Sequence, residues 1–378
     1  MRTSPLPLLS ALLAVLASVP AYSQGQAAPA IAPTGPMRWS RNSHTAVALP
    51  SGEVVVIGGA NARMQVRDIE IYDPATHAFH IAGQMKIPRQ GHSSYLLPDG
   101  RILSVGGYAQ GLNSLGQTQT EIFDPVTGAS VLGAKTEILF YEPRFIPLST
   151  GKILISNSYT ADNALYDPKT GTLLPTAPQL FARHNQCAAL LPNGKVLIAG
   201  GDSPESTSSA ELYDPATETT TPTQGPLAQP TTDSCLSTTL PDGQVLFFTS
   251  RLREDDGVLV SEIQQYDAST DTFKLVGTLS TPRSLPTVTA LLDGRVLIAG
   301  GLNFSPGTSP TLSSAEIFDP ASGAATPLDT PMSGGRANFA SALLPTGEVL
   351  LIGGSNMPAG DRGSDLSSVD LFTPSRNN

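Results

Sequence analysis

The sequence has 378 residues, with 22 Lys or Arg against 32 Asp or Glu, so its formal net charge is -10 at neutral pH. This acidity argues against a nucleic acid or an anionic membrane surface as partner, because both attract cationic proteins. The 35 glycines and 33 prolines would be typical of disorder in an aperiodic chain, but here they recur at regular intervals and therefore mark turns.

Residues 1–23 have the features of a secretory signal peptide. Arg2 precedes an apolar run that extends from Leu6 to Val19, and small residues follow at Ala21 and Ser23. The run is shorter than the roughly 20 residues that a membrane span needs. We therefore expect cleavage after Ser23, a secreted or periplasmic protein, no membrane insertion, and a single mature domain over residues 24–378.

The next segment, "AIAPTGPMRWSR", aligns with "FHIAGQMKIPR" of the first repeat described below. The last repeat stops after "VDLFTPSRNN", where a fourth strand is missing. We therefore predict that residues from Ile31 to Met37 supply this strand, so that both ends of the chain join in one sheet and no sheet edge stays open.

Four short strand-like runs then recur along the chain, as the first copy shows with "HTAVALP", "EVVVIGG", "IEIYDP" and "AFHIAG". A glycine marks the turn between the first two runs of each copy, at intervals of 43 to 53 residues: Gly52, Gly100, Gly151, Gly194, Gly243, Gly294 and Gly347. A recurring Asp, usually followed by Pro, marks the turn between the last two runs and is expected to form an Asx turn. Seven four-stranded sheets of this kind bury their faces when they stack radially, which predicts a β-propeller, with a solenoid as the less favoured alternative.

The repeat resembles the kelch motif in its hydrophobic strand ending in Gly-Gly, the variable loop that follows, and an aromatic residue before the Asp turn, and this resemblance covers residues 38–374. The aromatic residues are Tyr72, Phe123, Tyr166, Tyr213, Tyr266, Phe318 and Phe372. The resemblance implies an all-β, seven-bladed propeller with four antiparallel strands per blade, related to the central domain of galactose oxidase. Copper enzymes of that group carry an adjacent Tyr-His pair that this chain lacks, so we expect no metal and no cofactor.

Three features occur together in blades one, two, four, six and seven. These are an Arg eleven residues before the turn glycine, a Gly-Gly pair, and an acid: Arg41, Arg89, Arg183, Arg283 and Arg336, with Glu70, Glu121, Glu211, Glu316 and Asp370. Blades three and five lose all three, with Phe140, Ser156, Asn157 and Ala164 in one and Thr232, Thr249, Ser250 and Gln264 in the other. We therefore predict that the three features touch and have a structural role.

The residues after each Arg position are expected to line the mouth of the propeller, at the end that also carries the variable loops. The candidates are Asn42, His44, Gln90, His92, Tyr141, Glu142, Arg144, His184, Asn185, Asp233 and Asn338. They are polar and rich in amides, which favours a polar ligand. We expect a monomeric binding module for a carbohydrate or a protein, and the alternative is a carbohydrate-active enzyme (an epimerase, hydrolase or oxidase) that uses mouth histidines and carboxylates.

The two cysteines, Cys187 and Cys235, fall on the innermost strands of adjacent blades and on opposite blade faces. Export would permit a disulfide between them. Sheets that pack about 10 Å apart could also hold the two thiols too far from each other, so both states stay open.

Overall fold

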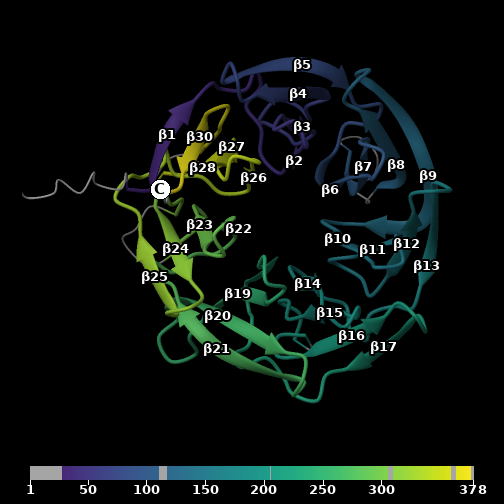
Figure 1. Ribbon diagram of the computed structural model, residues 1–378, viewed down its shortest axis with the longest axis vertical. Coiled ribbons are helices and arrows are strands. Elements are labelled where there is room, and N and C mark those ends of the chain that lie inside the picture. Colours follow the sequence, from purple (N-terminus) through teal and green to yellow (C-terminus); the bar gives the residue numbers. More distant parts are fainter. Residues whose placement is uncertain (1–27, 110–116, 205, 305–309, 359–362, 376–378) are drawn as a thin grey trace, which may run out of the picture.

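The computed structural model describes residues 28–109, 117–204, 206–304, 310–358 and 363–375, and these form a ring of seven four-stranded antiparallel sheets (Figure 1). The predicted all-β, seven-bladed architecture is confirmed. None of the described segments is a helix of the length and hydropathy that crossing a membrane requires. The predicted signal peptide, residues 1–23, lies outside the described residues.

The strands of blades 1 to 3 run from the central axis outward in chain order. Blade 1 contains β2 (Thr45–Ala48), β3 (Val54–Ile57), β4 (Asp68–Asp73) and β5 (Ala78–Gln84). Blade 2 contains β6 (Gln90–Leu96), β7 (Ile102–Tyr108), β8 (Gln117–Asp124) and β9 (Ala129–Phe140). Blade 3 contains β10 (Arg144–Pro147), β11 (Ile153–Ser156), β12 (Asn163–Asp167) and β13 (Thr172–Thr176).

Blades 4 to 6 repeat this order. Blade 4 contains β14 (Cys187–Leu190), β15 (Val196–Ala199), β16 (Ala210–Asp214) and β17 (Thr219–Pro222). Blade 5 contains β18 (Ser234–Thr239), β19 (Val245–Leu252), β20 (Leu259–Asp267) and β21 (Thr272–Thr278). Blade 6 contains β22 (Thr287–Ala290), β23 (Val296–Ala299), β24 (Ala315–Asp319) and β25 (Ala324–Pro327).

Blade 7 is completed by the N-terminal strand, as predicted. Its strand order is β26 (Ala340–Leu343), β27 (Val349–Ile352), β30 (Val369–Thr373) and β1 (Ala30–Thr34), and a small hairpin, β28 (Ser355–Asn356) and β29 (Ser364–Asp365), extends from it. Ile31 lies opposite Phe372, and Figure 1 shows the purple β1 beside the yellow β30. The strand ends at Thr34 because Gly35 follows, and a side chain there would lie 2.0 Å from the carbonyl oxygen of His77.

The turns follow from local sequence. In the first hairpin, the Gly52 amide donates to the Leu49 carbonyl at 2.9 Å, and Gly52 has a φ of 91°, which glycine adopts without strain. In the outer turn, the Asp73 carboxylate accepts from the Ala75 amide at 2.8 Å. The predicted Asx turn recurs at Asp124, Asp167, Asp214, Asp267 and Asp319.

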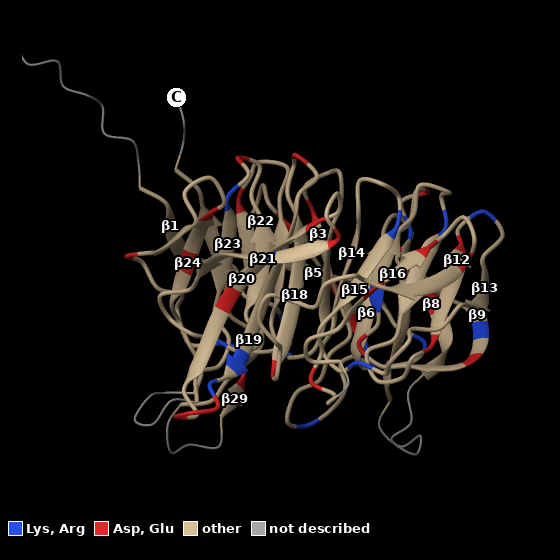
Figure 2. Ribbon diagram, turned by 90° about the horizontal axis from the view of Figure 1, so that it is seen from below, with Lys and Arg blue, Asp and Glu red and all other residues tan. Residues whose placement is uncertain are grey.

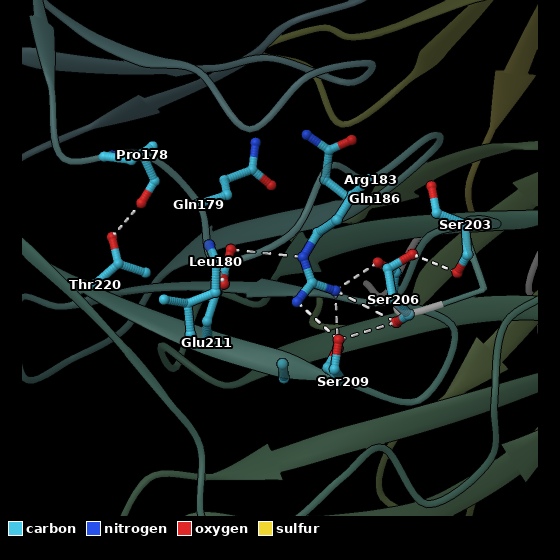
Figure 3. Close-up of polar contacts among 12 residues, drawn as sticks. Pro178, Gln179, Leu180, Arg183, Gln186, Ser203, Ser206, Ser209, Glu211 and Thr220 are labelled. Atoms are coloured by element: carbon cyan, nitrogen blue, oxygen red, sulfur yellow. Dashed lines mark hydrogen bonds and ion pairs between the residues drawn. The ribbon is translucent and has the colours of Figure 1, made fainter.

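The Arg, Gly-Gly and acid of five blades form one contact, which we call the seam unit. Arg41 donates from Nη1 to the Gly58 carbonyl at 3.0 Å and from Nη2 to Glu70 at 2.6 Å, while the second carboxylate oxygen of Glu70 accepts from the Arg38 amide at 2.7 Å. The other arginines reach their Gly carbonyls at 2.8 to 3.1 Å and lie within 4 Å of their acids. All five guanidinium groups are buried (Figure 3 shows the unit of Arg183 and Glu211).

The Gly-Gly pairs are the places where adjacent blades approach through their main chains. A side chain on Gly58 would lie 2.6 Å from the Arg89 carbonyl oxygen of blade 2, and the Gly59 amide donates to that same oxygen at 2.8 Å. The same amide contact joins blade 6 to blade 7 and blade 7 to blade 1. Glycine is therefore required here both by its positive φ and by the space that the next blade occupies.

Blades 3 and 5 replace the charged unit with neutral amides. Gln264 stands where the acid would be, and its Oε1 accepts from the Gln229 amide at 3.0 Å, as Glu70 does from Arg38. In blade 3, Asn157 accepts from the Tyr141 amide at 3.0 Å and donates to a backbone carbonyl of β9. Gln264 in blade 5 and Asn157 in blade 3 thus keep hydrogen bonds to the main chain, while the buried pair of arginine and acid is lost in both blades.

Cys187 and Cys235 form a disulfide between blades 4 and 5, with their Cα atoms 5.1 Å apart. The distance is shorter than the sheet spacing because blades converge toward the axis, where β14 and β18 lie. Other seams hold polar contacts at the same two positions, such as Ser93 Oγ donating to the Pro143 carbonyl at 2.6 Å. The bond is therefore the covalent version of a contact that recurs around the ring.

We predict that Glu70→Ala lowers the free energy of unfolding by about 3 to 5 kcal/mol, because it leaves the buried Arg41 charge without a partner. Urea unfolding of the purified protein measures this loss. The surface variant Lys195→Ala, which breaks the exposed pair with Asp214, should cost under about 1 kcal/mol. Equal losses in the two variants would contradict the structural role of the seam unit.

Candidate functional site

The mouth of the propeller is framed by residues two positions after each seam arginine or its replacement. Six of these seven have a left-handed backbone: Ser43, Gly91, Glu142, Asn185, Leu285 and Asn338. Their main chains link successive blades, since Ser43 N donates to Asn338 O at 2.9 Å, Gly91 N to Ser43 O at 3.0 Å, and Glu142 N to Gly91 O at 3.0 Å. We call this set the mouth ring.

The mouth lies at the end of the molecule that carries the loops between second and third strands. Figure 2 shows β29 and the far end of β19 at this edge, opposite the edge from which the C-terminus emerges. The tight hairpin turns occupy that opposite edge. The variable loops and the mouth ring therefore share one face.

Several of the predicted mouth residues bind one another around this ring. Asn42 donates to Asp365 of blade 7 at 2.6 Å, and Asn185 donates to the Asp233 carbonyl at 3.3 Å. Gln90 begins β6 and pairs in register with Tyr108 of β7, while Asn338 is exposed. Asn42 and Asn185 therefore link adjacent blades at the mouth.

His44 and His92 do not line the mouth, contrary to our prediction. Both are buried, at 7% and 4% exposure, and each ring packs against a Gly of the preceding blade. Phe339 of blade 7 fills the same space against Gly300. An imidazole at this position therefore acts as a packing ring, and burial together with the Arg41 charge lowers the pKa of His44 to about 3.

Four rings from blades 2, 3 and 4 meet on the loop-bearing face, and we call them the aromatic cluster: Tyr108, Tyr141, Tyr159 and His184. The ring centroids lie 5.6 Å apart for the first pair, 5.0 Å for the second and 4.5 Å for the third. Tyr108 ends β7, Tyr141 follows β9, Tyr159 lies between β11 and β12, and His184 precedes β14. Tyr159 is 47% exposed, so part of the cluster is open to a ligand.

Two carboxylates adjoin the aromatic cluster. Asp202 lies 3.2 Å from Nδ1 of His184, and Glu142 lies beside Tyr108, since both are 3.6 Å from the position of a side chain on Gly91. Burial raises the pKa of Tyr108 and of Tyr159, and the Glu142 charge raises both further. The site therefore combines stacking surfaces with hydrogen-bond acceptors of negative charge.

Tyr141, Glu142, His184 and Asn185 were predicted from the sequence as mouth residues, whereas Tyr108, Tyr159 and Asp202 were not. The three missed residues come shortly after the Gly-Gly position of blades 2 and 4 or its replacement in blade 3. Their position shortly after Gly-Gly was the feature of the sequence that could have identified them as site residues. Arg144, also predicted, donates from Nε to the Gln186 carbonyl at 3.2 Å, and burial lowers its pKa.

We predict that stability falls between about pH 6.5 and 5 because of the buried histidines. A histidine in the unfolded chain has a pKa near 6.5 and takes up a proton over this interval, whereas folded His44 stays neutral. Each such group lowers the free energy of unfolding by up to about 1.4 kcal/mol per pH unit. His44→Phe, which copies Phe339, should reduce this slope in urea unfolding, while the exposed control His80→Phe should not; equal slopes for His44→Phe and the parent would refute the assignment.

Comparisons with known proteins agree with this architecture. A family model described as the Kelch motif matches residues 41–86, which include the four strands of blade 1. A solved structure of a fungal alcohol oxidase of the AA5 family, in complex with copper, is similar with a TM-score of 0.67 and 18% identity, covering 91% of this chain and 75% of that chain. No curated protein matches the chain.

The described histidines are not arranged as a copper site. Among the side chains that the structure describes, no group of three His, Cys, Asp or Glu is placed to hold a metal ion. His44 and His92 pack against glycines of the preceding blades, and His184 lies against Asp202. The likeness to the oxidase is thus one of fold, and the chain is a seven-bladed β-propeller with a Kelch motif at residues 41–86.

Proposed function

We propose that the protein is an exported, monomeric binding module that takes a carbohydrate on the aromatic cluster of its loop-bearing face. The observation that carries the proposal is the contact of Tyr108, Tyr141, Tyr159 and His184 across three blades, with Tyr159 half exposed. Export rests on the composition of residues 1–23 alone.

The chemistry of the cluster suits a sugar. An exposed tyrosine ring offers an apolar face to the C–H groups of a pyranose, and its hydroxyl stays available for hydrogen bonding. Asp202 and Glu142 are acceptors for sugar hydroxyls, and Asn185 adds an amide next to His184. A few polar groups beside a stacking surface are typical of sites that fix the orientation of a polar ligand.

A carbohydrate-active enzyme of the same fold is the second candidate, and the His184–Asp202 contact favours it. The Asp202 carboxylate lies 3.2 Å from Nδ1 of His184, close enough to stabilise the imidazolium that forms when His184 accepts a proton from a substrate hydroxyl. Asn185 donates to the second oxygen of Asp202 at 3.5 Å, which helps to hold that carboxylate in place. A metal-independent proton transfer is the chemistry that these residues offer.

We predict that Tyr159→Ala weakens binding of the best ligand on a glycan array by about tenfold, the equivalent of about 1.4 kcal/mol, because it removes the exposed stacking surface. Isothermal titration calorimetry with the mature protein measures the change. The matched control is Phe304→Ala, which removes an exposed ring from a loop of blade 6.

Unchanged affinity in Tyr159→Ala, or equal losses in both variants, would contradict the proposed site. A peptide array run in parallel separates the carbohydrate proposal from a protein ligand. If the parent converts the bound sugar to a product, His184→Gln should abolish the conversion while Tyr159→Ala mainly weakens binding. Conversion that survives His184→Gln would rule out the enzymatic role of this pair.

A further inference from the structure

Glu142 adopts a backbone conformation that its residue type disfavours. Its φ is 40°, and the equivalent mouth-ring positions in blades 2, 4 and 7 carry Gly91, Asn185 and Asn338, which tolerate the left-handed region. The main chain of Glu142 links adjacent blades as the other ring positions do, because its amide donates to Gly91 O. Ser43 and Leu285 hold the same conformation in blades 1 and 6, so the ring sets this backbone whatever the residue type, and nothing in it requires a glutamate.

The carboxylate of Glu142 has no partner within the described part of the chain. Its amide and carbonyl are bonded to Gly91 and Ser158, but neither Oε atom takes part in a hydrogen bond or an ion pair. Arg144, two residues along, donates to the Gln186 carbonyl; its charge attracts that of Glu142, but no direct ion pair joins the two side chains among the described residues. The Glu142 carboxylate is thus partly buried with no direct donor on either oxygen, so an external ammonium group could donate to it.

Aromatic rings and a second carboxylate lie near the Glu142 carboxylate. The rings of Tyr108, Tyr141 and Tyr159 lie at angles near 50° to one another, at 48° and 50° for the two successive pairs. The face of an aromatic ring is negatively polarised and attracts an ammonium group, and Tyr159 is exposed enough to offer its face to a ligand. Asp202 adds a second negative charge beside Tyr159. Burial raises the pKa of Tyr159, and the charges of Glu142 and Asp202 raise this pKa further.

We propose that Glu142 and the aromatic cluster select a protonated amine, so that the bound carbohydrate is an amino sugar with a free amino group. The inference rests on the proposed function and names the ligand class of that same site. The ammonium group would neutralise Glu142 between the tyrosine rings, while the pyranose ring stacks on Tyr159. A neutral or an acetylated sugar would leave the carboxylate uncompensated.

The test compares three oligosaccharides of one length and one linkage that differ only at carbon 2: glucosamine, N-acetylglucosamine and glucose oligomers. At mildly acidic pH and low salt, we expect the mature protein to bind the glucosamine oligomer about tenfold more tightly than the other two. The preference should shrink as salt is added. Glu142→Gln should bind all three equally, and Glu53→Gln, which removes the same charge from the opposite end of the molecule, should keep the preference.

Glu142→Asn guards against misfolding as the cause of lost binding. Asparagine suits the left-handed backbone, as at Asn185 and Asn338, so this variant should melt at an equal or higher temperature and still lose the amine preference. Retention of the preference in Glu142→Gln or Glu142→Asn would overturn the proposal.

The remaining outcomes separate this inference from the proposed function. Equal binding of the three oligomers by the parent protein would overturn the amine inference and leave carbohydrate binding intact. Binding of other sugars on the glycan array, with none of these three bound, would have the same consequence. Binding of a lysine-containing peptide through Glu142 with no sugar bound would overturn both.

Discussion

At four seams a Gly-Gly residue lies against the main chain of the next blade, and the mouth residues beside these seams depend on that contact. Gly301 N donates to Arg336 O at 2.9 Å, and the Arg336 side chain reaches back to Gly353 of its own blade. The arginine side chain therefore holds its own main chain in place, and the preceding blade donates a hydrogen bond to the carbonyl of that main chain. A side chain on either glycine would push adjacent blades apart and shift the mouth ring with them.

The departures from this repeat coincide with the candidate site. Blade 3 has Asn157 in place of a Gly-Gly residue and Phe140 in place of the arginine, and its two following residues, Tyr141 and Glu142, belong to the site. The neutral hydrogen bonds of Asn157 keep the main chain in place without a buried ion pair. Blade 3 could therefore accept a tyrosine and a glutamate where other blades carry residues suited to the seam alone, and the site is asymmetric on a symmetric scaffold.

Features repeated in every blade were predictable from the sequence, and features that occur once were not. The strands, the Asx turns and the closing strand around Ile31 follow from periodicity, because each copy tests the interpretation of the others. Tyr159 and Asp202 follow the Gly-Gly position or its replacement, but the residue type at this offset differs from blade to blade, so the repeat pattern did not single them out. His44 and His92 were misassigned to the mouth, although Phe339 at the same offset from its arginine indicated a packing position.

The most direct test of the seam is a pair of glycine substitutions in blade 6. Gly300 and Gly294 both have positive φ, at 61° and 85°, but a side chain on Gly300 would lie 2.7 Å from Arg336 O, whereas one on Gly294 would meet nothing within 4 Å. Alanine at each site carries a similar backbone cost of about 1 kcal/mol, so the difference in urea unfolding isolates the approach between blades. We expect Gly300→Ala to lose several times more stability than Gly294→Ala, and equal losses would contradict the account.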